Sequence, residues 1–360
     1  MKWLRRVAIA LAVVVLLCAA PIVYVELRCT ATLDPLAQQA SPFAIAEPGY
    51  RRAVGDSYLT YPEWSIVYAY DDIAGVARRS SESAFDYLGE ITGFWRSLCR
   101  ATRAAQRVGP VTADQKITNY IIGLSFTAEM AVIGLYERTF GAATAWIRGP
   151  KRTGEDEYAL RVADDFAAYL RQTPWYQYPF FAKLKEFWRE TPFGEGNIVR
   201  SLERRFALTL EYGGKALYAI PIGALAGVSP ADLKLMSVVE RLDDKDYAAD
   251  PRIKKLRDIG EDATLIETPR YREYTEILRG LGARGRKVIE IAGNRRILAT
   301  VIARDGAKLT TSGAMEIFES PIQSRPGWRR IGLDAEVGSL TQLIGEVEKQ
   351  GAEFEHAFDY

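Results

Sequence analysis

The feature that most constrains the fold of this chain is an apolar run close to its N-terminus. The chain begins MKWLRRVAIALAVVVLLCAAPIVYVELRC, where three basic residues precede a charge-free run from Val7 to Val25. A bilayer core is crossed by roughly 20 apolar helical residues, and preceding basic residues favour a cytoplasmic N-terminus. We therefore expect residues 1–28 to form a single-pass transmembrane anchor that contacts lipid through residues 7–27.

A cleaved signal peptide is the alternative interpretation of this segment. Cys18, Ala19 and Ala20 loosely resemble a cleavage site. However, Pro21 would follow the cut, and apolar residues continue to Val25. An uncleaved signal-anchor is favoured, with the bulk of the chain in the periplasm or outside the cell. The excess of arginine over lysine is typical of GC-rich bacterial genomes, so we expect the inner membrane of a bacterial envelope.

Composition excludes several classes of function. The formal net charge is only +1, so no basic field would gather nucleic acid, and we expect no nucleic-acid partner. The single histidine, His356, excludes multi-histidine metal sites and histidine-based triads. We expect His356 to be a packed, hydrogen-bonded residue on a strand, with a catalytic role as the minority alternative. No metal site and no cofactor are predicted.

A glycine motif in the C-terminal third does not change this expectation. GLGARG, from Gly280 to Gly285, matches the letters of the dinucleotide fingerprint. The fingerprint requires a strand before it and a helix after it, whereas here the helical YREYTEILR precedes it and KVIEI follows. Glycines that end a helix explain the motif.

The remaining chain divides into three parts by pattern. Residues 29–58 are rich in Pro, Ala, Gln and Ser and are typical of a linker. Residues 59–263 show helical spacing, for example Ile198, Leu202, Phe206 and Leu210, and predict a helical domain. Residues 264–360 show alternation, with a hairpin predicted to turn at Gly293 and Asn294. The predicted fold class is mainly α with a C-terminal α+β module, an antiparallel sheet carrying helices on one face.

Two cysteines would lie outside the membrane under this topology. A disulfide between Cys29 and Cys99 suits an oxidising compartment. The alternative is that Cys99 is a small core residue of an amphipathic helix.

Glu129 stands in the apolar stretch ITNYIIGLSFTAEMAVIGLY. If it faces the interior, it should find a cation or a tyrosine hydroxyl, or else hold a raised pKa. Three interpretations stay open: a surface residue, a buried structural pair, and a ligand or acid/base role. A second membrane span over residues 117–136 is a further alternative, disfavoured because a central carboxylate is costly in lipid.

Two functions follow from these patterns. The first is a non-enzymatic envelope protein that binds an apolar ligand or a protein partner through aromatic clusters, with Tyr61, Trp64, Trp175 and Tyr176 as candidate ligand-binding residues. The second is a carboxylate-dependent hydrolase acting on envelope glycans. It would use Glu129 as the acid and Glu63 or Asp71 as its partner.

Overall fold

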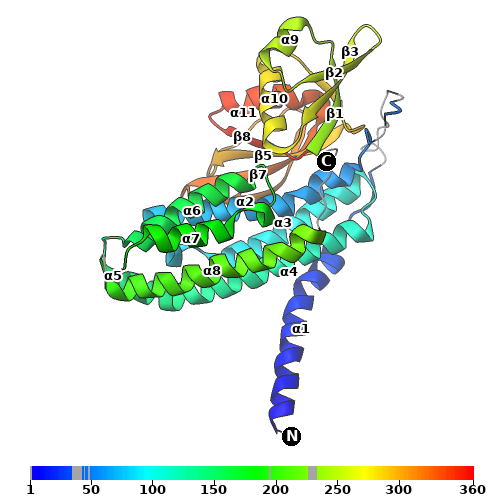
Figure 1. Ribbon diagram of the computed structural model, residues 1–360. Helices are drawn as coiled ribbons and strands as arrows, with labels where there is room; N and C mark the ends of the chain where they lie inside the picture. Colours follow the sequence, from blue (N-terminus) through cyan, green and yellow to red (C-terminus); the bar gives the residue numbers. More distant parts are fainter. Residues whose placement is uncertain (1, 35–42, 44, 48, 194–195, 226–232) are drawn as a thin grey trace.

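The structure is a computed structural model that describes residues 2–34, 43, 45–47, 49–193, 196–225 and 233–360. The described chain is mostly helical and carries two antiparallel sheets, which confirms the coarse form of the predicted fold class (Figure 1). The α-helices are α1 (Lys2–Arg28), α2 (Val54–Arg79), α3 (Tyr87–Val108), α4 (Ala113–Tyr136), α5 (Ala142–Arg148), α6 (Gly154–Leu170), α7 (Phe180–Glu190), α8 (Ile198–Leu225), α9 (Asp244–Ala249), α10 (Tyr271–Ala283) and α11 (Leu340–Lys349). The strands are β1 (Lys234–Glu240), β2 (Lys254–Ile259), β3 (Ala263–Pro269), β4 (Val288–Ile291), β5 (Arg296–Arg304), β6 (Ala314–Pro321), β7 (Trp328–Glu336) and β8 (Glu353–Ala357).

Local sequence explains where several helices begin. Thr112 caps α4 by accepting a hydrogen bond from the Gln115 N–H at 3.3 Å, and the Gln115 side chain accepts one from the Thr112 N–H at 2.8 Å. This capping box satisfies two backbone donors that the first turn leaves free. Asp86 caps α3 by accepting from the Gly89 N–H at 3.1 Å. The breaks between these helices therefore follow from side-chain chemistry.

The helix α2 begins earlier than the pattern predicts. Its first residue is Val54, inside the predicted linker, and Pro62 lies within the helix. A proline removes one helical hydrogen bond. The turn before it is held by tertiary packing, because Tyr58 and Leu59 are buried in one cluster with Phe358 of the C-terminal segment.

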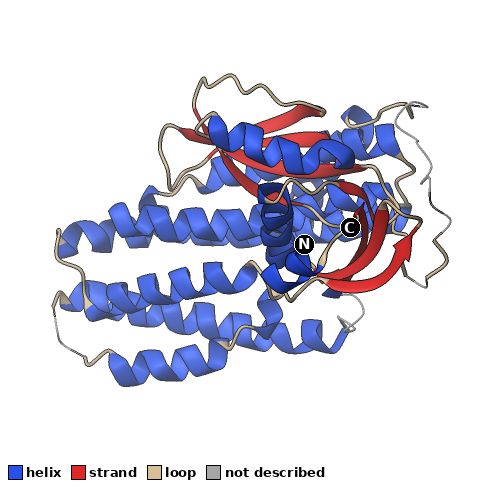
Figure 2. Ribbon diagram, turned by 90° about the horizontal axis from the view of Figure 1, so that it is seen from above, coloured by secondary structure: helices blue, strands red, loops and turns tan. Residues whose placement is uncertain are grey.

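The central helix is α2, which packs against α3, α4, α6 and strand β5. The Ser57 hydroxyl donates to the Phe358 carbonyl at 2.6 Å and accepts from the Leu298 N–H at 2.9 Å. The Tyr58 hydroxyl donates to Asp334 Oδ1 at 2.5 Å. These contacts join the helices to the strands in one packed unit. Figure 2 shows the strands gathered on one side, with the helices extending beyond them.

The two sheets share one topology. Their strand orders are β2-β3-β1-β4 and β6-β7-β5-β8, and every pairing is antiparallel. In each sheet the last strand follows a helix, α10 before β4 and α11 before β8. The α+β part therefore consists of two copies of one supersecondary unit, which share a hydrophobic core with α10 and α11.

Two details of the α+β part differ from prediction. The first strand begins at Lys234 rather than after residue 264. The turn of the predicted hairpin is present, since Ile291 and Asn294 form an antiparallel bridge. The predicted pairing of its two strands is wrong, because β4 pairs with β1 whereas β5 pairs with β7 and β8. The turn at Ala292 and Gly293, both with positive φ, passes the chain from one sheet to the other. A tight turn between two apolar runs does not reveal whether those runs pair with each other.

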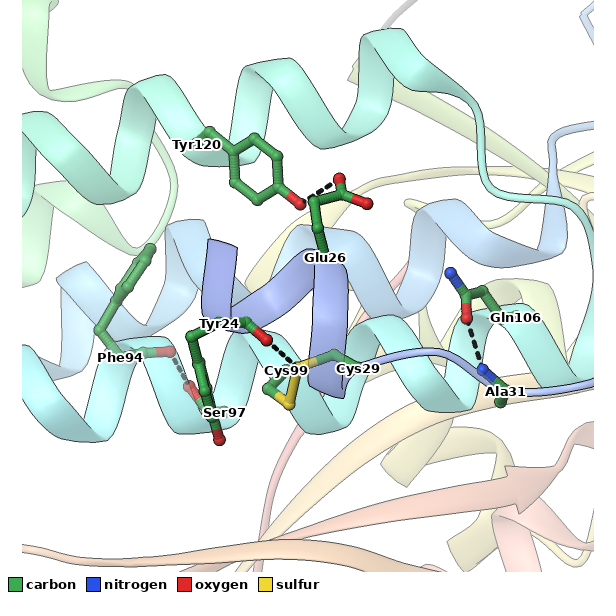
Figure 3. Close-up of a disulfide and its surroundings, with 9 residues drawn as sticks. All are labelled: Tyr24, Glu26, Cys29, Ala31, Phe94, Ser97, Cys99, Gln106 and Tyr120. Atoms are coloured by element: carbon green, nitrogen blue, oxygen red, sulfur yellow. Dashed lines mark hydrogen bonds between the residues drawn. A yellow bond between two sulfur atoms is a disulfide. The ribbon is translucent and has the colours of Figure 1, made fainter. Parts of the chain in front are cut away.

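The C-terminal end of α1 is fixed to the helical body (Figure 3). A disulfide joins Cys29 to Cys99 of α3, with the Cα atoms 5.0 Å apart. Glu26 accepts hydrogen bonds from Lys116 Nζ at 2.9 Å and from the Tyr120 hydroxyl at 2.7 Å. The end of α1 is therefore joined directly to α3 and α4.

By length and composition, one helical stretch of the described chain could cross a membrane, from Ala113 to Arg148. It comprises α4, the π-helical turn η2 (Glu137–Gly141) and α5. The N-terminal span itself stays a prediction.

Candidate functional site

The candidate site is a cavity of about 590 Å³ where α2 meets α10 and the strands β7 and β8. This volume is in the range of small-molecule sites. Three of its α2 residues, Trp64, Tyr68 and Asp71, are three or four positions apart and so share one helix face. Strand β8 contributes His356, so we call this space the His356 cavity.

His356 is buried in the wall of the cavity. Its ring lies against the Trp64 indole, with centroids 3.8 Å apart, and meets the Phe358 ring edge-on at 4.8 Å. Nδ1 lies 3.0 Å from the Thr275 hydroxyl of α10. Nε2 has no hydrogen-bond partner among the described residues.

The partners of Thr275 indicate which histidine nitrogen carries the proton. The Thr275 hydroxyl oxygen accepts from the Ala357 N–H at 3.1 Å. If this hydroxyl donates its own proton to His356 Nδ1, the neutral imidazole carries its hydrogen on Nε2. Burial lowers the pKa of His356 to about 3, with Arg171 and Arg279 acting in the same direction, so the ring is neutral at pH 7. His356 then presents one N–H donor that no described protein group satisfies.

The charged groups around the cavity are largely paired with one another. Arg330 makes two hydrogen bonds to Glu355, at 2.6 and 2.8 Å, and its guanidinium lies 3.6 Å from the centroid of the Tyr68 ring. Burial alone would lower the pKa of Arg330, but Glu355 raises it above its ordinary value. Arg171 and Asp71 approach to 2.5 Å. The wall is therefore polar but internally neutralised.

Asp72 also lines the cavity, but it supports the backbone of a loop. Its carboxylate accepts from the N–H groups of Gln323 at 2.9 Å and Ser324 at 3.0 Å. Asp72 thus fixes the segment between β6 and β7 against α2, and that segment carries Arg325 into the cavity wall.

The chain matches no protein-family model, no curated protein and no solved structure. Within the described ranges, no group of three or more His, Cys, Asp or Glu side chains is arranged to hold a metal ion.

The candidate acid Glu129 lies outside the His356 cavity, in a charged cluster between helices. It accepts a hydrogen bond from the Tyr70 hydroxyl at 2.5 Å and lies 3.2 Å from Lys215 Nζ of α8. Burial alone would lower the pKa of Lys215, but Glu211, Tyr70 and Glu129 raise it. Glu129 has thus found both the cation and the tyrosine hydroxyl expected of an inward-facing carboxylate.

Neither proposed partner of Glu129 is among the residues that contact it, Tyr70 and Lys215. Glu63 is exposed on α2 and does not line the His356 cavity. Asp71 lines the cavity but is paired with Arg171. Burial raises the pKa of Asp71, while Arg171 lowers it. Of the three carboxylates considered for hydrolysis, only Asp71 lines the cavity.

The four aromatic candidates lie in different places. Trp64 lines the cavity, whereas Tyr61 is buried against Phe318, with ring centroids 4.4 Å apart. Trp175 and Tyr176 belong to a short helical turn beside α8, where Trp175 stacks on Tyr218 at 5.4 Å. Only Trp64 is placed to meet a ligand in the cavity.

Sequence reasoning missed the residues that line the cavity with His356. Thr275, Arg330 and Glu355 lie in segments with ordinary helix and strand patterns. The only available signal was the uniqueness of His356 in the chain. That signal pointed to the strand but contained no information on what would pack against it.

Proposed function

We propose that this protein is a binding protein of the bacterial envelope, anchored in the inner membrane by α1, that takes a small polar ligand into the His356 cavity. The observation that carries the proposal is that His356 lines the cavity and that its buried Nε2 has no described protein partner. A buried donor left unsatisfied costs about 1–3 kcal/mol. A ligand oxygen at this nitrogen removes that cost.

The chemistry of the wall favours a polar ligand over the apolar one expected from the aromatic clusters. The guanidinium groups of Arg279 and Arg330 and the carboxylate of Glu355 belong to the lining. Because the wall charges are paired, binding need not neutralise a large net charge. A neutral or zwitterionic molecule with a carbonyl, carboxylate or hydroxyl oxygen fits best.

Two observations support the proposed compartment. The run from Val7 to Val25 contains no charged residue. The Cys29–Cys99 bond suits an oxidising environment outside the cytoplasm. Both agree with the inner membrane as the site of the anchor and the periplasm or cell exterior as the site of the body.

A glycan hydrolase is the alternative. Of its three candidate carboxylates only Asp71 lines the His356 cavity, because Glu129 and Glu63 do not. The ion pair between Asp71 and Arg171 weighs against that role. Loss of glycan cleavage in an Asp71→Asn variant would favour the alternative.

The binding proposal predicts that His356→Phe weakens ligand binding by about tenfold or more, the loss expected for one buried hydrogen bond. Phenylalanine keeps a ring against Trp64 and Phe358 but removes both nitrogens. Native mass spectrometry of the full chain in detergent would detect a copurifying small molecule. The change in melting temperature with succinate, free amino acids or N-acetylated amino sugars would show which chemical class of ligand binds.

The matched control is Arg189→Ala, an exposed residue of α7 that does not line the cavity. It should bind as the wild type does. If no small molecule copurifies and no probe shifts the wild-type melting temperature, the binding proposal is wrong. Equal binding by His356→Phe and wild type would show that His356 does not contribute to ligand binding.

A further inference from the structure

The helix α8 carries its charged side chains inward and its apolar side chains outward. Arg200, Arg204 and Arg205 are buried in ion pairs with carboxylates of other segments. Its exposed residues carry no charge, and the large apolar ones among them are Ile198, Val199, Leu202, Phe206, Leu210, Leu217 and Ile220. This arrangement is the reverse of the usual amphipathic helix in water.

The neighbouring helix α4 also exposes large apolar side chains, namely Ile117, Ile121, Val132 and Leu135. The carboxylates of Glu129 in α4 and Glu137 in η2 turn to α8, where they pair with Lys215 at 3.2 Å and Arg204 at 2.7 Å. The two helices therefore lie side by side and antiparallel. We use the name outer face for these exposed apolar residues, four on α4 and seven on α8.

An apolar face of this size is costly in water. Fully burying one leucine or phenylalanine side chain is worth about 1.5–3 kcal/mol, and the outer face contains eleven large apolar side chains. Continuous exposed apolar surfaces mark contact with a partner protein or with lipid. The position of α1 decides between these two.

The helix α1 leaves the body beside the outer face. Glu26, near the end of α1, pairs with Lys116, and Lys116 directly precedes Ile117, the first outer-face residue of α4. Val25 is buried in the core of the helical body, and Cys29 is bonded to Cys99. Figure 1 shows α1 projecting on the side formed by α4 and α8, with the sheets on the opposite side. A bilayer around α1 therefore meets α4 and α8 first.

We propose that the outer face lies in the interfacial layer of the bilayer that α1 crosses. The proposal rests on α1 being embedded in that bilayer. Figure 1 shows α4 and α8 running across the direction of α1, so they would lie along the membrane plane and not span it. Such helices bury their apolar side roughly 5–10 Å into the boundary between headgroups and acyl chains.

The test places a fluorescent label on the full chain in lipid nanodiscs that contain nitroxide-bearing lipids. The Cys29–Cys99 bond is kept and Cys18 is replaced by serine, so that Phe206→Cys or Leu210→Cys accepts a single label. These side chains are 61% and 60% exposed. The matched control is Leu256→Cys, a leucine of β2 that is 42% exposed on the sheet side. We expect lipid nitroxides to quench labels at 206 and 210 by roughly twofold or more and to leave the label at 256 unquenched.

A label on native Cys18, which is exposed on α1, reports separately on the anchor. Quenching at Cys18 without quenching at 206 and 210 would overturn the interfacial proposal and leave the anchor intact. Absence of quenching at all three positions would overturn both. A blue-shifted label at 206 that lipid nitroxides do not quench would assign the outer face to a second copy or another protein, which also contradicts the proposal.

Discussion

Replacing Arg200 by methionine should lower the free energy of unfolding by about 3–5 kcal/mol, because it removes a buried cation that two buried carboxylates share. Arg200 is 0% exposed. Its guanidinium lies 2.9 Å from both Asp156 and Glu203, and it donates to the Thr144 hydroxyl at 3.0 Å. Methionine fills a similar volume, so the loss measured is mainly electrostatic. Chemical denaturation of the full chain in detergent would measure it.

Arg189→Met is the matched control for this prediction. The Arg189 side chain is 75% exposed on α7, and its ion pair is with the adjacent Glu190. Surface pairs of this kind contribute about 0–1 kcal/mol. If Arg200→Met and Arg189→Met unfold at the same denaturant concentration, the buried network does not stabilise the helical body as described.

Breaking the disulfide should have an effect of similar size. Cys29 and Cys99 are 70 residues apart in sequence, and closing a loop of that length contributes about 4 kcal/mol in the chain-entropy model. Cys99→Ala should therefore lower the free energy of unfolding by about that amount and loosen the attachment of α1. Unfolding of the wild type with and without reductant would separate the cross-link from the packing lost at the alanine.

Cys18→Ala is the control, because Cys18 is exposed on α1 and is not bonded. It should unfold as the wild type does, and reductant should destabilise it equally. A wild type whose unfolding is unaffected by reductant would show that the bond does not stabilise the fold.

The helical part of the fold was largely predictable, because periodicity is a local signal. The helix α3 follows the amphipathic pattern around Cys99. The N-caps Asp86 of α3 and Thr112 of α4 were not identified from the sequence. The orientation of α8 was not predictable in the same way. Ile198, Leu202, Phe206 and Leu210 indicate an apolar stripe, but periodicity does not tell whether the stripe faces a core or a membrane.

The strand pairings and the site depend on contacts that local patterns do not contain. The alternation around Gly293 predicts two strands correctly, yet their partners lie far away in sequence. Likewise, His356 meets Thr275 and Trp64 only because β8 lies between α10 and α2. Three elements have to pack before this site exists. A single sequence could identify the unusual residue but not the cavity around it.

The oxidation state of the cysteines in intact cells tests whether α1 is an uncleaved membrane anchor with the body outside the cytoplasm. Cells are quenched with acid, the protein is denatured, and thiols are labelled with polyethylene-glycol maleimide before and after reduction. We expect one adduct before reduction, at Cys18, and three after it. Three adducts without reduction would place the body in the cytoplasm. None before and two after would show that residues up to Cys18 have been removed, and either result would contradict the account.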